Sequence, residues 1–189
     1  MESTQNLQGK KIAALMTEGF EQVEFTEPKK ALQDAGATVH LIAPKGGSVK
    51  AWDETEWGET FDADLPLAGA DPSQYDALLL PGGVMNPDNL RTEQQAIKFI
   101  QHFFEQQKPV AAICHAPTLL VEADVVDGLT LTSFPSIKTD LRNAGADWVD
   151  QEVVVDGNLV TSRNPNDIPA FNRETIKLIS EGVKEKQSA

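Results

Sequence analysis

The sequence predicts an α/β protein in which a mostly parallel β-sheet is covered by helices on both faces. Several short segments are almost entirely apolar, among them 12–16, 75–80 and 109–113. Strands of this kind are typical of parallel sheets, in which both faces are buried. Longer stretches with helical spacing of apolar residues lie between them, and strands that alternate with helices indicate parallel crossovers. The two patterns together favour a layer of helices on each side of one sheet.

The individual elements follow from these patterns and from the glycine and proline residues that separate them. We expect strands at 12–16, 38–43, 75–80, 109–113, 129–132, 149–158 and 159–162. We expect helices at 23–35, 88–107, 117–123, 136–143 and 166–181. The segment 45–70 has no clear period, and a small hairpin or an irregular arm fits it equally well.

Length and composition limit the class of protein. The 189 residues hold no internal repeat or linker, which favours one domain, 1–189, with a structured core at about 10–183. The formal net charge of −13 argues against stable binding to nucleic acid or anionic lipid, because both need clustered Lys and Arg. The single cysteine excludes an internal disulfide, and neither a metal site nor a cofactor is expected. Without an apolar run of membrane-span or signal-peptide character, we expect a cytoplasmic protein without membrane contact.

Cys114 lies where a reactive side chain would be placed. It follows the apolar strand 109–113, stands next to His115, and precedes a helical pattern that begins at Pro117. A sharp turn from strand to helix would raise its sulfur above the sheet, near the free N–H groups that open the helix, and these favour a thiolate. Such a turn is a nucleophile elbow with Cys in place of Ser. The alternative is a buried, inert cysteine.

Three segments should come together at one edge of the sheet, because ligands bind at the carboxyl ends of parallel strands. They are 18–21, 81–83 and 114–115. Glu21 is the candidate carboxyl for the sulfur, with Glu18 and Asp88 as further acidic residues at the rim. The backbone N–H groups of Gly82, Gly83 and His115 are candidate donors to an oxyanion.

Other polar residues near this region receive simpler interpretations. Adjacent residues on a bend do not generally face one another, so the His115 ring is not expected to reach the Cys114 sulfur. That ring could instead act on substrate or water, oriented by Asp88, or form part of the pocket wall. Glu24 and Glu27 are expected to be solvated charges at the start of the first helix.

The whole pattern resembles the ThiJ/PfpI superfamily, and within it the PfpI-like intracellular protease branch, which also contains deglycases and glyoxalases. The matching segments occur in the family order and cover most of the chain: 19–21, 75–83, 87–91, 108–117, 137–140, 144–150, 153–158 and 161–163. The resemblance implies a flavodoxin-like three-layer sandwich, of the class I glutamine amidotransferase type. It also implies a nucleophilic Cys114, a carboxyl at Glu21 hydrogen-bonded to it, and His115 as the third functional residue.

The resemblance leaves the activity open between three functions. The first is a stress-response enzyme that acts on reactive carbonyls or glycated adducts through a Cys114 thiolate. The second is a cysteine peptidase, which in this family takes a triad acid from a neighbouring subunit; Asp88, one carbon shorter than the family's glutamate, is the nearest equivalent. The third is a redox sensor or stress chaperone. The resemblance also implies a homodimer or a larger ring, to which Trp52, Trp57 and Phe61 are candidate contributors.

Overall fold

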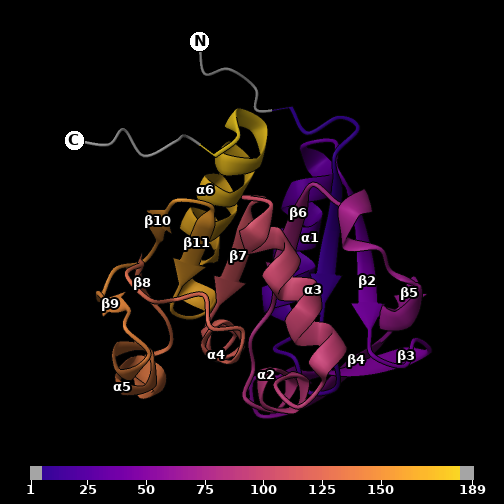
Figure 1. Cartoon of the computed structure of the whole chain (residues 1–189). Coiled ribbons are helices and arrows are strands. Elements are labelled where there is room, and N and C mark those ends of the chain that lie inside the picture. The colour runs from indigo at the N-terminus through magenta and orange to yellow at the C-terminus, as the bar shows by residue number, and fades with distance from the viewer. Residues whose placement is uncertain (1–5, 184–189) are drawn as a thin grey trace.

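The computed structural model describes residues 6–183 and contains one central sheet (Figure 1). Its seven strands have the order β10-β11-β7-β6-β1-β2-β5, and only β10 is antiparallel to its neighbour. The strands of this sheet are β1 (Lys11–Leu15), β2 (Thr38–Ala43), β5 (Leu65–Pro66), β6 (Ala77–Leu80), β7 (Val110–Ile113), β10 (Val154–Asp156) and β11 (Leu159–Ser162). The prediction of a mostly parallel α/β sheet is confirmed.

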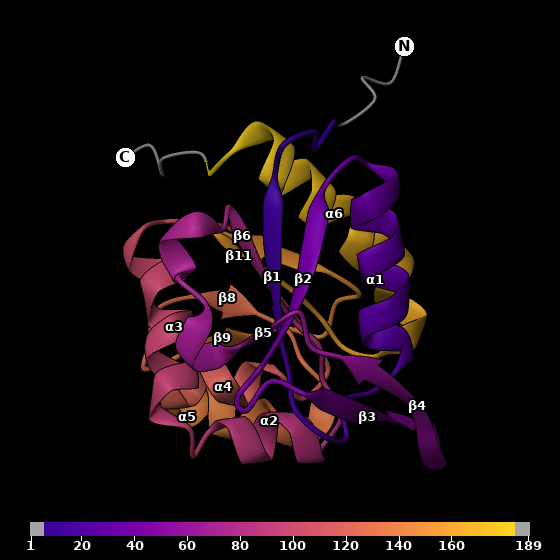
Figure 2. The same cartoon turned by 90° about the vertical axis from the view of Figure 1, so that its right-hand side faces the viewer.

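Helices cover both faces of this sheet, as Figure 2 shows from its edge. The helices are α1 (Val23–Asp34), α2 (Met85–Leu90), α3 (Gln94–Glu105), α4 (Pro117–Glu122), α5 (Lys138–Asn143) and α6 (Ile168–Glu181). Buried residues of α1 and α6 belong to the core on one face, and those of α2, α3, α4 and α5 to the core on the other. The predicted three-layer arrangement therefore holds.

Alternation along the central strands explains why two cores form. In β1, Ala13 and Leu15 pack into one core, whereas Ile12 and Ala14 pack into the other. Successive side chains of a strand point to opposite faces, so a strand buried on both faces must be apolar at every position. The uninterrupted apolar runs in the sequence have this origin.

Two regions refine the expected elements. The unassigned segment 45–70 contains an antiparallel hairpin, β3 (Ser48–Asp53) and β4 (Glu56–Asp62), before β5. The prediction of a single helix at 88–107 was wrong, because α2 ends before Thr92 and α3 begins after it. The Thr92 hydroxyl donates to the Asn89 carbonyl over 2.8 Å, and Glu93 has an extended backbone. A side chain that bonds to the preceding turn competes with the helical ladder.

The remaining elements are short. A second small sheet pairs β8 (Thr130–Leu131) with β9 (Asp147–Trp148). Four 3₁₀ turns complete the described part of the chain, at 67–69, 72–74, 135–137 and 165–167. Within residues 6–183 no helix is long and apolar enough to cross a membrane.

The strand order defines where a site can form. From β1 the chain adds β2 on one side of β1, and it later crosses over to add β6 on the other side. The direction in which strands are added to the sheet therefore reverses between β1 and β6. Open α/β sheets bind ligands in the crevice that such a change leaves at the carboxyl ends of the strands. The ends of β1, β6 and β7 meet there, and each is followed by a segment that the sequence singles out.

Candidate active site

Cys114 occupies a strained turn directly after β7. Its φ angle is +65°, in the left-handed region that side chains other than glycine rarely adopt. The Cys114 N–H donates to the Ser162 carbonyl over 3.0 Å, and its carbonyl accepts the Phe134 N–H over 2.8 Å. These two backbone hydrogen bonds, one from the N–H and one to the carbonyl, hold Cys114 in this conformation. Helix α4 begins three residues later. The local geometry is the strand–turn–helix elbow that the sequence predicts.

The His115 ring reaches the Cys114 sulfur, contrary to our expectation. Its Nδ1 lies 3.2 Å from Sγ, and its Nε2 lies 3.1 Å from the Ser136 hydroxyl. The ring also stacks on Phe134, with centroids 4.6 Å apart and planes inclined by 21°. Because Cys114 has a left-handed backbone, the two neighbouring side chains can turn toward each other. Neither Ser136 nor Phe134 was singled out in the sequence.

Burial lowers the pKa of His115, so its ring is neutral at physiological pH. A neutral imidazole has one nitrogen that carries a proton and one that accepts. With Nδ1 beside the thiol and Nε2 beside a hydroxyl, the ring can take the thiol proton at Nδ1 and keep its own proton directed at Ser136. This arrangement supplies a base for the sulfur.

Glu24 is the carboxyl beside Cys114, and the expectation that it is a solvated charge was wrong. It lies on the first turn of α1 and its side chain has no exposed surface. Its Oε2 accepts the Gly82 N–H over 2.8 Å, and Oε1 is buried without a regular hydrogen-bond partner among the described residues. Burial raises the pKa of Glu24 to about 8, with the Gly82 N–H and the Cys114 thiol opposing the shift. At neutral pH Glu24 is therefore mainly a neutral acid in contact with the thiol.

Glu21 lies at the outer edge of the site, at the entrance of the cavity described below, rather than beside the Cys114 sulfur. It is half-buried, and its Oε1 accepts the Glu54 N–H over 3.1 Å. Burial raises the pKa of Glu21, and the carboxylates of Asp53 and Glu54 add to that rise. The position next to Cys114 that we expected Glu21 to fill is filled by Glu24, one helical turn further along the chain.

The surroundings of Cys114 on balance favour its thiol over its thiolate and raise its pKa well above the ordinary value. Burial raises the pKa of Cys114, and so does the Glu24 carboxyl, whereas the backbone N–H groups of Gly83 and His115 lower it. A thiolate therefore needs an acceptor for its proton, and the neutral His115 ring, whose Nδ1 lies 3.2 Å from the sulfur, is in place to accept it. Once formed, the thiolate faces two backbone donors and the acid of Glu24.

The glycine pair after β6 allows this close packing. A Cβ on Gly82 would lie 2.6 Å from Glu24 Oε2 and 2.7 Å from Cys114 Cβ, so only glycine fits. Gly83 has a φ of +76°, and a Cβ there would meet the Gly19 carbonyl at 2.5 Å. Since the Gly82 N–H is bound to Glu24, the N–H groups of Gly83 and His115 are the ones directed at the sulfur.

The side chains enclose a cavity of about 430 Å³. Val84, Met85 and Glu54 are among the exposed residues of its lining. Its lining consists of Gly19, Glu21, Glu24, Trp52, Glu54, Gly83, Val84, Met85, Cys114, His115, Phe134 and Pro165. No group of His, Cys, Asp and Glu side chains within the described residues is arranged to hold a metal ion.

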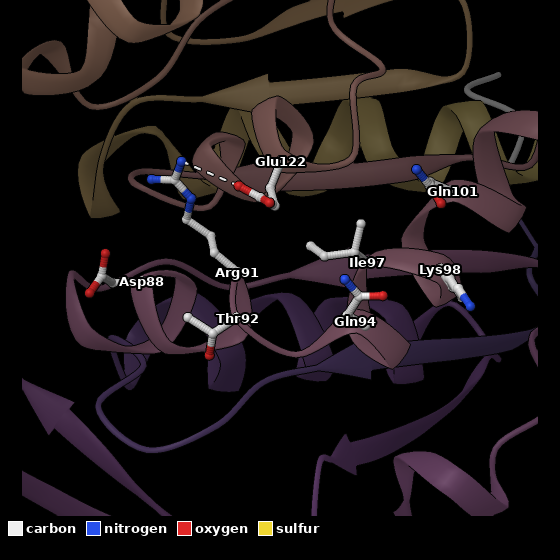
Figure 3. A pocket seen from close by; sticks show the side chains of 8 residues that line it. All are labelled: Asp88, Arg91, Thr92, Gln94, Ile97, Lys98, Gln101 and Glu122. Carbon is white, nitrogen blue, oxygen red and sulfur yellow. Dashed lines mark ion pairs between the residues drawn. The ribbon is translucent and has the colours of Figure 1, made fainter.

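Asp88 is separate from this cavity. It lies on α2 and lines a different groove, of about 670 Å³, formed with α3 and α4 (Figure 3). In that groove Arg91 and Glu122 form an ion pair with 3.6 Å between Nη2 and Oε2. Within one chain, His115 thus has a serine and not a carboxylate as its second partner.

Comparison with known proteins is consistent with this fold and its motifs. The chain is 46% identical to protein/nucleic acid deglycase 2 of Escherichia coli, and the match covers 90% of this chain and 98% of that protein. It is also 46% identical to general stress protein 18 of Bacillus subtilis, with the same coverage. YraA of the same organism, provisionally named a cysteine protease, is 44% identical over 90% of this chain and 98% of its own length.

Solved structures of related proteins have the same fold. The crystal structure of Drosophila melanogaster DJ-1beta superposes with a TM-score of 0.83 and 29% identity, covering 92% of this chain and 91% of that chain. A two-domain protein of Anabaena variabilis with DJ-1/ThiJ/PfpI-like and ferritin-like domains superposes with a TM-score of 0.85 and 35% identity, over 95% of this chain but 52% of that one. A model of the DJ-1/PfpI family matches residues 10–178. The chain therefore belongs to the DJ-1/PfpI family.

Proposed function

We propose that this protein is a cytoplasmic stress-response enzyme that uses Cys114 to act on reactive carbonyls or on the adducts they form with side chains. The observation that carries the proposal is the position of the Cys114 thiol, 3.2 Å from a neutral His115 Nδ1 and in contact with the buried Glu24. A nucleophile, a base and an acid that stays protonated at neutral pH then surround one atom. The names of the deglycase and stress-protein relatives point to the same class of reaction.

The reaction on a 2-oxoaldehyde can be written with these groups alone. His115 Nδ1 takes the thiol proton, and the sulfur attacks the aldehyde carbon, which forms a C–S bond and an alkoxide. The alkoxide receives a proton from Glu24 or His115, with the backbone N–H groups of Gly83 and His115 near the developing charge. A proton then moves from the hydroxyl-bearing carbon to the adjacent carbonyl carbon, through an enediol, and leaves a thioester. Water cleaves the thioester into a 2-hydroxy acid and the free thiol.

An adduct on a side chain needs one more bond change. The thiolate attacks the hydroxyl-bearing carbon, the bond from that carbon to the side-chain nitrogen or sulfur breaks, and the leaving atom takes a proton. The repaired side chain departs and the remaining steps are unchanged. The cavity of about 430 Å³ is of a size that suits a small carbonyl or the end of one modified side chain.

A cysteine peptidase is the second candidate, favoured by the contact of His115 with the thiol and by the name of YraA. Amide cleavage needs a protonated leaving nitrogen and an oriented imidazole. Since Asp88 lies outside the Cys114 cavity, this activity requires an acid from a second copy of the chain, and α2 presents Asp88 on its exposed side. A homodimer or larger ring is part of this proposal, and sedimentation of the protein tests it. A redox sensor or stress chaperone is the third candidate.

Turnover by wild type and Cys114→Ala distinguishes the three. The substrates are methylglyoxal, a methylglyoxal-modified lysine or cysteine derivative, and a casein-type peptide reporter. The exposed α1 variant Glu27→Gln serves as the control, and blanks correct for carbonyl consumed by buffer and free thiols. Loss of carbonyl substrates that requires Cys114, without peptide cleavage, supports the proposal. Peptide cleavage alone would favour the peptidase and make Asp88→Asn the next variant, and inactivity on all substrates would leave the sensor.

A further inference from the structure

The lining of the Cys114 cavity carries negative charge, and no Lys or Arg of residues 6–183 belongs to it. Glu21 and Glu54 line the cavity, and Glu24 lies buried below them. Apart from His115 and Cys114, these carboxyl groups are the titratable side chains of the lining, and no Lys or Arg of the described residues is among them. Lys50 of the neighbouring hairpin lies over the Trp57 ring, 5.8 Å from its centroid, and is not part of the lining.

The hairpin turn fixes these charges in place. Glu54 has a left-handed φ of +56° at the tip of the β3–β4 hairpin, and its N–H donates to Glu21 Oε1 over 3.1 Å. This contact holds the two carboxylates near each other, with Asp53 close enough to raise the pKa of Glu21. Charges of one sign in a partly enclosed cleft concentrate counter-ions of the opposite sign.

The cavity also offers apolar and polar groups that suit a cationic ligand. The indole of Trp52 is held by a hydrogen bond from Nε1 to the Glu54 carbonyl over 2.9 Å and packs edge-on against Trp57. Aromatic faces attract ammonium and guanidinium groups. Deeper in the cavity, Glu24 Oε1 is fully buried and lacks a regular hydrogen-bond partner among the described residues. Because this carboxyl stays mainly protonated at neutral pH, its free oxygen can donate to or accept from a ligand in the cavity.

We propose that Glu21 and Glu54 make the Cys114 cavity selective for positively charged substrates, namely carbonyl adducts on arginine or lysine side chains within basic peptide segments. An adduct on arginine keeps its guanidinium charge, and neighbouring basic residues add to the attraction. Anionic substrates such as adducts on nucleic acid are repelled by the same carboxylates. The assignment to adducts rests on the proposed function, whereas the charge selectivity is a property of the cavity itself.

Cys114 supplies a readout that needs no turnover, because it is the single cysteine of the chain. Methanethiosulfonate reagents that carry a trimethylammonium group, no charge or a sulfonate all react with the thiol in the same way: each forms a mixed disulfide with the sulfur and releases methanesulfinate. Their rates with the protein, measured by intact-protein mass spectrometry, are divided by their rates with 2-mercaptoethanol. We expect the corrected ratio of cationic to anionic reagent to be on the order of ten at low salt and to approach one in 1 M salt.

Matched variants locate the effect. Glu21→Gln retains an oxygen for the Glu54 N–H, and each of Glu21→Gln and Glu54→Gln should lower the corrected ratio about two- to threefold. The control Glu105→Gln makes the same charge change at the exposed end of α3, next to the segment that leads into the start of β7. It should leave the ratio unchanged. A wild-type ratio near one, or a control that changes the ratio as much as the entrance variants, would overturn the charge selectivity.

Turnover then connects the selectivity to substrates. Two peptides carry one methylglyoxal-modified arginine, flanked by lysines in the first and by glutamates in the second, and modified single-stranded DNA is the anionic comparison. We expect the lysine-flanked peptide to have the highest kcat/KM, with the difference reduced in Glu21→Gln. Equal rates on all three substrates would reject the assignment to basic segments. A charge-dependent labelling ratio without turnover of any carbonyl would instead reject the proposed function and leave the selectivity intact.

Discussion

The carboxyl of Glu24 contacts the thiol of Cys114, although one residue lies on the first turn of α1 and the other at the end of β7. Both are buried, and they share the Gly83 N–H as a nearby donor. A protonated acid, a thiol and a neutral imidazole thus meet without a metal ligand set among the described residues. Several consequences of this contact can be measured.

Replacement of Glu24 by Gln should lower kcat on the carbonyl substrate by about 10²-fold or more, because the amide cannot release or accept a proton. KM should change little, since the shape of the side chain is kept. The matched control is Glu27→Gln, an exposed carboxyl on the same helix. Steady-state kinetics of wild type and the two variants test this prediction. A wild-type kcat in Glu24→Gln would show that Glu24 transfers no proton in the rate-limiting part of the reaction.

Stability should fall as the pH rises from about 4.5 to 8. The pKa of Glu24 is raised from its ordinary value of 4.5 to about 8, so across this window the unfolded chain releases a proton that the folded chain keeps. The unfolded state is favoured by the difference, on the order of a few kcal/mol. Urea unfolding of wild type and Glu24→Gln at pH 5 and pH 8.5 measures it. The variant should show a much smaller loss between the two pH values, and parallel losses in both proteins would contradict the assignment.

Ser136 should position the His115 ring. Ser136→Ala removes the partner of Nε2, which lies 3.1 Å away, and should lower kcat several-fold with little effect on KM. Ser136→Thr keeps a hydroxyl and should restore part of the activity. The Nε2 and Nδ1 chemical shifts of His115 provide a readout beyond activity, because the tautomer balance should change in the alanine variant alone. An unaltered tautomer and an unaltered pH profile in Ser136→Ala would show that the contact is incidental.

A methyl group at Gly82 should disrupt the site from within. The added Cβ would lie 2.6 Å from both Glu24 Oε2 and the Ile113 carbonyl, so Gly82→Ala should destabilise the fold by about 1–3 kcal/mol and abolish turnover. Gly157→Ala is the control, because its Cβ would meet nothing within 4 Å and only its φ of +59° is strained, at about 1 kcal/mol. The control should keep its activity. Denaturant midpoints and kinetics of both variants test the close approach.

Much of the fold was predictable from local sequence. The apolar runs that form β1, β6 and β7 indicate strands buried on both faces, and these are the strands whose ends carry the site. The break between α2 and α3 was missed, because it depends on the Thr92 side chain bonding to a carbonyl in the preceding turn. Helical spacing of apolar residues continues across such a break, so the pattern does not mark it.

The carboxyl that contacts Cys114 shows most clearly what the sequence does not predict. A signal for Glu24 was present, since it shares the buried stripe of α1 with Pro28 and Leu32, each four residues apart. A carboxyl in an apolar stripe needs a partner, but nothing in the sequence says which. The chain around Glu21 instead pairs with Trp52 as an isolated bridge before α1 begins, which turns the Glu21 side chain to the entrance.

The sequence by itself thus determined the sheet, its two cores and the elbow that carries Cys114, because these depend on the periodicity of neighbouring residues. The tertiary structure alone decided that Glu24 and not Glu21 reaches the sulfur, that the His115 ring turns toward it, and that Asp88 lies in another groove. Those outcomes depend on the rotation of α1 against the sheet and on the left-handed backbone of Cys114. Both arise from packing between segments far apart in the chain, which local patterns do not encode.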